Sequence, residues 1–352
     1  MKARFLLLLP VIGFSPTSAQ SHRSFTLTSR VLAEMQPTEK DHSPQSRVLA
    51  AQRFLETLTE PQRQELTRTP EDPERRTWTN TPPSAKSGGL RLGDLNETQL
   101  LSAYDFLSTI LSNEGFTKTR QLMLADDMLV QSEKRALRRG GFGAANFWVV
   151  LFGPPSTTEP WGVQVDGHHL ALNLTFVGEH MTMSPSFIGT QPHRFFLGSE
   201  EILPMEEETR GAFEFMASLD AEQRQAATQG DQRGRIRAGA GKDGAKPDPR
   251  GLSCRELTPE QRQKLLKLVS LWIDDMPAPA FQSRRQEIED QLEDTFFAWY
   301  GPHQAGGDAS FHLNGPSLIL EYAGQNLGGN PRDHLHSIYR DPENEYGLKW
   351  TK

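Results

Sequence analysis

Histidines are the residues of this chain whose type and spacing best fit catalysis or metal binding. The chain contains 10 of them, and four form two short motifs, His168-His169 and His334-Leu335-His336. Residues at i and i+2 of an extended strand share one face, so His334 and His336 would present both imidazoles to one side. With one imidazole from another strand they would give three nitrogen ligands, the arrangement of catalytic zinc, which also suits copper or iron. The sequence therefore predicts a divalent transition metal held by His168 or His169 with His334 and His336.

The position of the first pair adds a restriction. His168 and His169 follow Asp166-Gly167, a dipeptide typical of tight hairpin turns, and precede an apolar run. We expect them to begin a strand, where neighbouring side chains point to opposite faces, so that only one of the two enters a given site. The alternative stays open that these histidines are hydrogen-bonded structural residues, because an isolated His-x-His motif has no metal specificity by itself.

A carboxylate inside an apolar run is the second candidate for chemistry. Glu321 stands within residues 318–322, and if it is buried there it needs a partner. Arg340 or a histidine could be that partner, and Asp333 or Asp341 could orient the imidazoles. We therefore take Glu321 and Arg340 as catalytic candidates, with Glu321 as metal ligand or general base. On an exposed sheet edge Glu321 would have no such role.

Other catalytic arrangements find less support. The sequence has no G-x-S-x-G elbow and no H-E-x-x-H motif, which argues against an α/β-hydrolase serine and against the common metalloprotease pattern. Cys254 is the only cysteine, so no internal disulfide can form, and we expect a small buried side chain there. The acidic runs 206–208 and 274–275 are predicted to be solvated charge on helices.

The elements that must position these residues repeat within the chain. The region 161–176 is echoed by 310–322 at a constant offset of 148 residues, so that Gly167 corresponds to Gly315. A capping-box pattern, in which Thr, Asn or Asp is followed three residues later by Gln, also marks four helix starts. These starts are residues 59–62, 96–99, 220–223 and 258–261, with a spacing of 37 residues in the first pair and 38 in the second.

We therefore predict an α+β protein built by internal duplication from two similar units, residues 51–210 and 211–352. Each unit would be a helix pair followed by a small antiparallel sheet, and the units would pack across a pseudo-twofold seam. Helices are expected at 99–111 and 261–272, where apolar residues recur at three-to-four spacing. The predicted strands, of which the second and third in each unit form a hairpin, are 146–152, 161–165, 170–177, 295–300, 310–313 and 318–322.

Two stretches lie outside this repeat. Residues 233–250 are Gly-rich, basic and without periodicity, which predicts a surface loop. Ala240 stands where a Walker loop needs Lys, so phosphate binding there has little support. Trp78 has polar and proline neighbours, and it is either a packing anchor or a platform for stacking a sugar; we favour the anchor.

The N-terminus is typical of an export signal. Lys2 and Arg4 precede an apolar run at 5–14, and small residues follow up to Ala19, which predicts cleavage of residues 1–19. The apolar run is shorter than the roughly 20 residues of a membrane span, so we expect no stable membrane insertion. Residues 20–50 are expected to form a mobile leader. Cleavage would change the formal charge from −7 to −9, which argues against nucleic-acid binding.

Several short motifs of this chain are specific in combination. They are Trp78-Thr79-Asn80-x-Pro82, Phe152-Gly153-Pro154, Pro160-Trp161-Gly162, Gly167-His168-His169-Leu170, Pro185-x-Phe187-Ile188-Gly189, Ala298-Trp299-x-Gly301, His334-Leu335-His336-Ser337 and Tyr346-Gly347. Over residues 75–350 the chain thereby resembles the uncharacterised family called domain of unknown function 3500, with Glu345 standing where the family has Asp. The family's recurring Gly-His-His and His-x-His motifs match 168–169 and 334–336. The resemblance implies a mostly exported, largely bacterial protein without an established activity.

These observations favour an exported protein, periplasmic or secreted, that is a metal-dependent enzyme of hydrolytic or oxidative type. Its histidine-rich site would lie at the seam of the two units. The alternative is an exported binding protein without chemistry, which holds a small molecule or a glycan in the cleft between the units. That cleft would be lined by the aromatic residues Trp148, Trp161, Phe187 and Trp299.

Overall fold

A computed structural model describes residues 26–82, 88–132, 141–327 and 329–351. The predicted export segment, residues 1–19, lies outside these ranges, as does the start of the predicted leader. Among the residues that are described, no helix combines the length and the apolar character that crossing a membrane requires.

Within the described ranges, twelve strands form one large, mostly antiparallel sheet in the order β1-β3-β4-β5-β6-β14-β13-β12-β11-β10, with β2 beside β3 and β9 beside β11. The first half of the chain, up to residue 210, supplies β1 (Thr67–Arg68), β2 (Leu90–Arg91), β3 (Phe147–Phe152), β4 (Trp161–Gly167), β5 (Leu170–Val177) and β6 (His180–Thr190). The second half supplies β9 (Thr228–Gly230), β10 (Leu252–Ser253), β11 (Phe296–Tyr300), β12 (Ser310–Asn314), β13 (Ile319–Gly324) and β14 (Leu335–Arg340). A separate hairpin is formed by β7 (Phe195–Leu197) and β8 (Glu200–Ile202).

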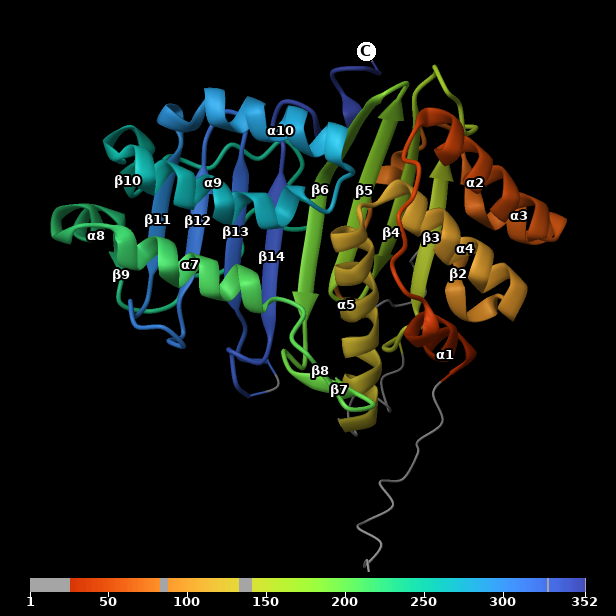
Figure 1. Ribbon diagram of the computed structural model, residues 1–352, viewed down its shortest axis with the longest axis horizontal. Coiled ribbons are helices and arrows are strands. Elements are labelled where there is room, and N and C mark those ends of the chain that lie inside the picture. The colour runs from red at the N-terminus through yellow and green to blue at the C-terminus, as the bar shows by residue number, and fades with distance from the viewer. Residues whose placement is uncertain (1–25, 83–87, 133–140, 328, 352) are drawn as a thin grey trace, which may run out of the picture.

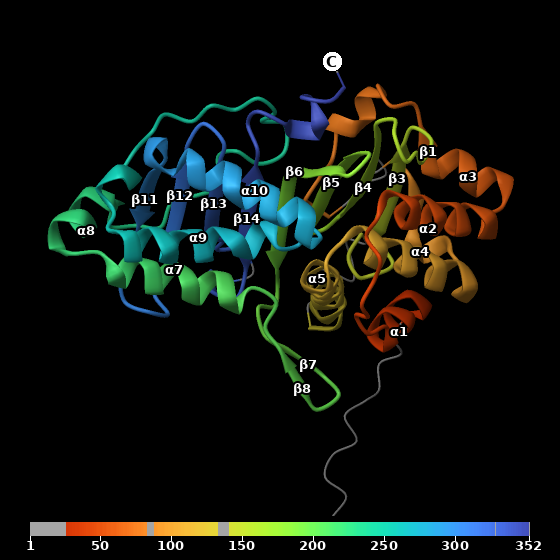
Figure 2. The same cartoon turned by 45° about the horizontal axis from the view of Figure 1, so that its top comes forward.

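The α-helices cover one face of this sheet, as Figures 1 and 2 show for α5, α7, α9 and α10. Their bounds are α1 (Leu27–Glu34), α2 (Pro44–Thr57), α3 (Glu60–Leu66), α4 (Glu97–Ile110), α5 (Asn113–Ser132), α7 (Glu206–Ser218), α8 (Ala221–Ala227), α9 (Pro259–Ile273) and α10 (Ala278–Asp290). Short 3-10 turns are η1 (Pro73–Arg76), η2 (Leu92–Asp94), η3 (Cys254–Glu256), η4 (Leu292–Asp294) and η5 (Glu345–Gly347).

All four predicted capping boxes are present. The side chains of Thr59, Asn96, Asp220 and Thr258 each accept from the backbone amide three residues on. The side-chain oxygen of the Gln at that position accepts in turn from the backbone amide of the cap residue. Satisfying these free amides is what starts α3, α4, α8 and α9 where they start. The helices expected at 99–111 and 261–272 are confirmed as α4 and α9.

The six predicted strands are confirmed, and β4–β5 and β12–β13 pair as the expected hairpins. Two separate small sheets are not found, because β6 pairs antiparallel with β14 and joins both halves. Neither of these two strands was among the six predicted. Nearly every residue of β6 is buried, so its sequence lacks the alternation that identifies a half-exposed strand.

The main core lies between the helices and the sheet. Phe106 of α4 stacks on Trp161 of β4, with ring centroids 6.4 Å apart, and Phe213 of α7 meets Trp299 of β11 edge to face at 5.1 Å. Trp161 and Trp299 are therefore core residues, and the prediction that they line a cleft is wrong.

The opposite face of the sheet is covered by loops over a small second cluster. Trp78 is buried there, and the centroid of its ring lies 6.4 Å from that of Phe187. Its Nε1–H donates to the Tyr346 hydroxyl at 2.9 Å. The interpretation of Trp78 as a packing anchor is confirmed. Phe187, expected in a cleft, packs in this cluster. Ala238 packs there too, so the Gly-rich segment is not only a surface loop.

Two acidic residues that were predicted to be solvated are buried instead. Oε1 of Glu208 of α7 and Oδ1 of Asp275, after α9, lie 2.9 and 3.1 Å from Nζ of Lys118 of α5. This buried ion-pair network ties helices of the two halves together. Cys254 is fully buried, as predicted, and burial raises the pKa of its thiol to about 12.

Candidate metal centre

His168 and His169 form the two-residue turn between β4 and β5. The last residue of β4, Gly167, pairs directly with Leu170, the first of β5. A two-residue hairpin needs positive φ, and His169 adopts a φ of 68°. The expectation that both histidines begin a strand and face opposite sides is therefore wrong. Their rings stack with centroids 3.6 Å apart.

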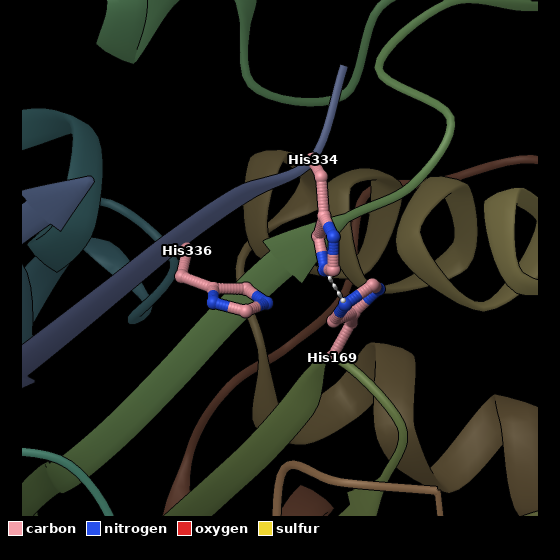
Figure 3. Close-up of side chains that lie close together, drawn as sticks. All are labelled: His169, His334 and His336. Carbon is pink, nitrogen blue, oxygen red and sulfur yellow. Dashed lines mark hydrogen bonds between the residues drawn. The ribbon is translucent and has the colours of Figure 1, made fainter. Parts of the chain in front are cut away.

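Three histidines from the two motifs converge. Nε2 of His169 lies 2.8 Å from Nε2 of His334, and the rings of His169 and His336 have centroids 5.0 Å apart. One ring nitrogen from each of the three lies within 4.8 Å of the other two. Figure 3 shows the imidazoles of His334 and His336, which descend from the start of β14, meeting His169 at the end of the β4–β5 hairpin.

Pairing of β6 with both neighbours brings the motifs together. Gly189 of β6 donates its amide hydrogen to the carbonyl of His169 at 2.6 Å and lies opposite His336 in the ladder with β14. A Cβ atom at Gly189 would lie 2.8 Å from Cδ2 of His336 and 3.2 Å from Cδ2 of His169. Glycine at this position therefore leaves the space that the two imidazoles occupy.

The surroundings keep these imidazoles neutral and point a lone pair into the cluster. Nδ1 of His334 lies 2.5 Å from the carbonyl oxygen of Leu327, so the proton belongs on Nδ1 and Nε2 carries the lone pair. Burial, with smaller contributions from the neighbouring imidazoles, holds the pKa values of His169 and His336 well below the usual range. Nε2 of His336 is buried, and none of the residues that the structure describes forms a hydrogen bond with it. Neutral imidazoles with free lone pairs are the form that binds metal ions.

His168 belongs to a second, overlapping group. Its Nδ1 lies 2.5 Å from Oδ1 of Asp126 on α5, and the ring of Phe142 packs edge-on against it at 4.7 Å. The other carboxylate oxygen of Asp126 accepts from the amide of Gly143. Asp126, His168 and His169 also have ligand atoms within 4.8 Å of one another. Sequence reasoning missed Asp126, although an acidic pair inside the otherwise apolar stretch of α5 is a signal for it.

The catalytic candidates Glu321 and Arg340 do not join the histidines. Oε2 of Glu321 accepts from the backbone amides of Arg237 and Ala238, and Glu321 is a member of neither histidine group. The pairing of Glu321 with Arg340 is not found, because the Arg340 guanidinium donates to Glu345 at 2.6 Å.

The other predicted carboxylates also have different partners. Asp333 accepts from the backbone amide of His193, and Asp341 lies 3.1 Å from the Arg284 guanidinium. The orientation of the imidazoles comes instead from Leu327 and Asp126, neither of which was predicted.

The fold and the site together define an α+β protein with a buried three-histidine cluster where the two halves of its sheet meet. The chain belongs to the family described as protein of unknown function (DUF3500), whose model matches residues 41–348. The resemblance that the sequence motifs indicated is thereby confirmed. Comparison with curated proteins found no match. Comparison with solved structures found none either.

Proposed function

We propose that this protein is an exported metal-dependent enzyme, hydrolytic or oxidative, in which His169, His334 and His336 hold a divalent transition metal. The observation that carries the proposal is the convergence of three neutral imidazoles, two of them buried and one partly buried, from the β4–β5 turn and the start of β14. Nε2 of His336 has no hydrogen-bond partner in the described part of the chain, and Nε2 of His169 and Nε2 of His334 face each other at 2.8 Å. A buried cluster of this kind has lone pairs that only a cation or shared protons can satisfy.

The donor set favours particular ions. Three imidazole nitrogens and no thiolate suit zinc, copper or iron, and three protein ligands leave a coordination position free for water or substrate. A bound zinc ion would supply a water of lowered pKa for hydrolysis, whereas copper or iron would supply oxidative chemistry. His336 is the least buried of the three histidines.

His168 is the group that we propose for proton transfer. Asp126 accepts from Nδ1 of His168 at 2.5 Å, which fixes the orientation of the ring and its tautomer. The ring lies against His169 without belonging to the three-histidine group. This arrangement follows the general logic of a base that is oriented by a carboxylate. In this proposal His168 takes the role of general base that the sequence suggested for Glu321.

The test is elemental analysis of protein purified from its export compartment without chelator or nickel resin. The wild type is expected to contain about one metal ion per chain, and His334→Ala/His336→Ala to contain none. His180→Ala/His303→Ala removes two exposed imidazoles as a matched control and should keep the metal. Asp126→Asn should also keep it, because Asp126 acts on His168 rather than on the ion.

Absence of metal from both the wild type and the double variant would overturn the proposal. In that case the alternative, a non-catalytic binding protein for a small molecule or glycan, would be favoured. Thermal stability separates the two as well, since chelation should lower the Tm of a metal protein and leave that of a metal-free binding protein unchanged.

We also propose that the two halves of the chain arose by internal duplication of one unit. Gln164↔Asn173 in β4–β5 and His312↔Glu321 in β12–β13 are both cross-strand pairs, at an offset of 148 residues. In both halves a short strand also runs parallel to the first long strand, as β1 with β3 and β9 with β11. The glutamines of the capping boxes bond to each other in both halves, Gln99 to Gln62 at 2.9 Å and Gln261 to Gln223 at 2.7 Å. Shared register and shared contacts support descent of both halves from one unit.

We also propose that the protein is exported, because the sequence of residues 1–19 is typical of an export signal. Mass spectrometry of the protein recovered from the periplasm or medium should find a new N-terminus at Gln20. Recovery of the uncleaved chain in the cytoplasm alone would contradict export.

A further inference from the structure

Glu321 lies at the floor of a separate pocket on the loop-covered face of the sheet. The pocket has a volume of about 310 Å³ and lies beneath the Gly-rich segment 237–250. Its floor consists of Glu321, His312 and Asn314, which are 0%, 2% and 5% exposed. These three side chains share one face of β12 and β13, because Glu321 pairs directly with His312 and Asn314 lies two residues further along its strand.

Each floor residue has a buried polar atom without a hydrogen-bond partner among the described residues. The atoms are Oε1 of Glu321, Nε2 of His312 and Oδ1 of Asn314. The other carboxylate oxygen of Glu321 is fixed by the amides of Arg237 and Ala238 at 2.5 and 2.9 Å, so Oε1 is held in place. Buried acceptors are normally paired, and an unpaired set that lines a cavity calls for a ligand.

The unpaired atoms of the three floor residues are all hydrogen-bond acceptors. Nδ1 of His312 lies 4.0 Å from Oε1 of Glu321, so a proton on Nδ1 faces the carboxylate. That tautomer leaves a lone pair on Nε2, which has no hydrogen-bond partner among the described residues. A carboxylate oxygen, an imidazole lone pair and an amide oxygen therefore face the same space. A group with several N–H donors and a positive charge complements them, as a primary ammonium does.

The corresponding place in the first half shows that the fold does not require unpaired atoms here. Gln164 and Asn173 occupy the positions of His312 and Glu321 in the same register. Nε2 of Gln164 donates to Oδ1 of Asn173 at 2.6 Å, and Nδ2 of Asn173 donates to the carbonyl of Pro185 at 2.9 Å. This neutral pair satisfies itself, whereas its ionisable counterpart in the second half leaves acceptors directed into a cavity.

The rim of the pocket carries the opposite charge. The exposed cations Arg237, Lys242, Lys246 and Arg250 line it, with Asp248 beside them. A net positive rim over an acceptor floor attracts a molecule with a carboxylate at one end and an ammonium at the other. The volume lies at the small end of ligand pockets, so the molecule is of the size of an amino acid or a short peptide.

We propose that this pocket binds a small amino carboxylate, with its ammonium on Glu321, His312 and Asn314 and its carboxylate toward the rim lysines. The site is independent of the histidine cluster and does not rest on metal binding. No covalent step is involved. It gives the Gly-rich segment a role, since that segment supplies both the amides that fix Glu321 and the cations at the rim.

The experiment screens the full-length protein against the proteinogenic amino acids and γ-aminobutyrate by thermal shift, followed by calorimetry on the best binder. Blocking its ammonium by N-acetylation, or its carboxylate as the amide, should each weaken binding at least about tenfold. Glu321→Gln keeps the size of the side chain and should weaken binding about 100-fold, because a buried carboxylate partner is lost.

Two surface variants keep the proposal testable if Glu321→Gln folds poorly. Lys242→Ser/Lys246→Ser changes only exposed residues and should weaken binding about three- to tenfold through the carboxylate. Lys264→Ser/Lys267→Ser removes the same charge from exposed positions of α9 and should leave affinity unchanged.

Three results would overturn the proposal. The first is no binding of any of these compounds at millimolar concentration. The second is binding that survives N-acetylation, which would make the pocket an anion site. The third is binding of Zn²⁺ or Mg²⁺ that Glu321→Gln abolishes while His334→Ala/His336→Ala does not, which would make the pocket a cation site.

Discussion

Gly189 lies directly opposite His336 across β6 and β14, where a Cβ atom would approach Cδ2 of that imidazole to 2.8 Å. Gly189→Ala should therefore displace His336 while all three imidazoles remain in the chain. We expect metal affinity to fall about 10- to 100-fold, the usual range when residues that position a ligand are changed. Competition with a chromophoric chelator measures this directly.

The matched control is Gly230→Ala in β9. There the nearest atom to an added Cβ is Cδ1 of Tyr300, at an ordinary 3.7 Å, and metal affinity should not change. Equal affinity in wild type and Gly189→Ala would show that His336 does not hold the ion.

Asp166 makes stability depend on pH. Burial raises the pKa of this carboxyl from 3.8 to about 7. The backbone amide of Thr79, which donates to the carboxyl at 3.1 Å, has the smaller opposite effect and lowers the pKa. The folded state therefore favours the protonated acid, and stability falls as pH rises from about 4 through 7. Asp166→Asn removes that penalty and keeps an oxygen for Thr79. The variant should match the wild type near pH 4 and exceed it by about 2–4 kcal/mol at pH 8.

Urea unfolding of the wild type and of Asp166→Asn between pH 4 and 8 gives the difference between their free energies of unfolding. The histidines contribute equally to both proteins, so their contributions cancel in this difference. Asn314 stands at the corresponding position of the second half, so an amide is compatible with this place in the fold. As a control, Asp294→Asn at an exposed site should show no such trend. A constant difference between Asp166→Asn and wild type from pH 4 to 8 would contradict the assignment.

Lys118 should be the most sensitive lysine to substitution. It is the partner of two buried carboxylates, Glu208 and Asp275. Lys118→Met would leave both without a cation and lower the free energy of unfolding by about 3–5 kcal/mol. The loss should shrink in acid, because burial raises the pKa of Asp275 and protonation then removes its charge. Lys264→Met, on the exposed side of α9, should change stability by less than about 0.5 kcal/mol.

Because the glutamines pair in the same way in both halves, replacing the corresponding glutamine in either half should lower the stability by a similar amount. Nε2 of Gln99 donates to Thr57 and Gln62, and Nε2 of Gln261 donates to Ser218 and Gln223. Gln99→Ala and Gln261→Ala should each lower stability by about 1–3 kcal/mol, since each leaves buried partners unpaired. The two losses should add in the double variant, because the glutamines share no partner. Denaturant titration of the four proteins tests this, and a cost confined to one half would contradict the equivalence.

Local signals predicted much of this fold. Capping boxes identified the starts of α3, α4, α8 and α9, because capping depends on side chains within four residues of one another. Turn dipeptides and apolar runs identified six strands. The joining of the halves was not predictable, because β6 is buried on both faces and pairs with a strand more than 140 residues away.

The site was predictable in its residue types and only partly in its geometry. His169, His334 and His336 come together as the spacing suggested. The turn was placed two residues too early, at Asp166-Gly167, because the sequence does not show that His169 tolerates positive φ here. The roles of Asp126 and Leu327 depend on long-range packing. The acidic pair in α5 is a local signal for Asp126, but it does not indicate which residue Asp126 contacts.

The pairing of β6 with β14 has a consequence for biosynthesis. His169 emerges from the ribosome long before His334 and His336, and the ladder that aligns them forms only after the last strand is present. An ion held by all three could not be captured by a nascent or truncated chain. Metal would then bind only to complete chains, after translocation. The metal content of a sample would therefore distinguish complete molecules from fragments.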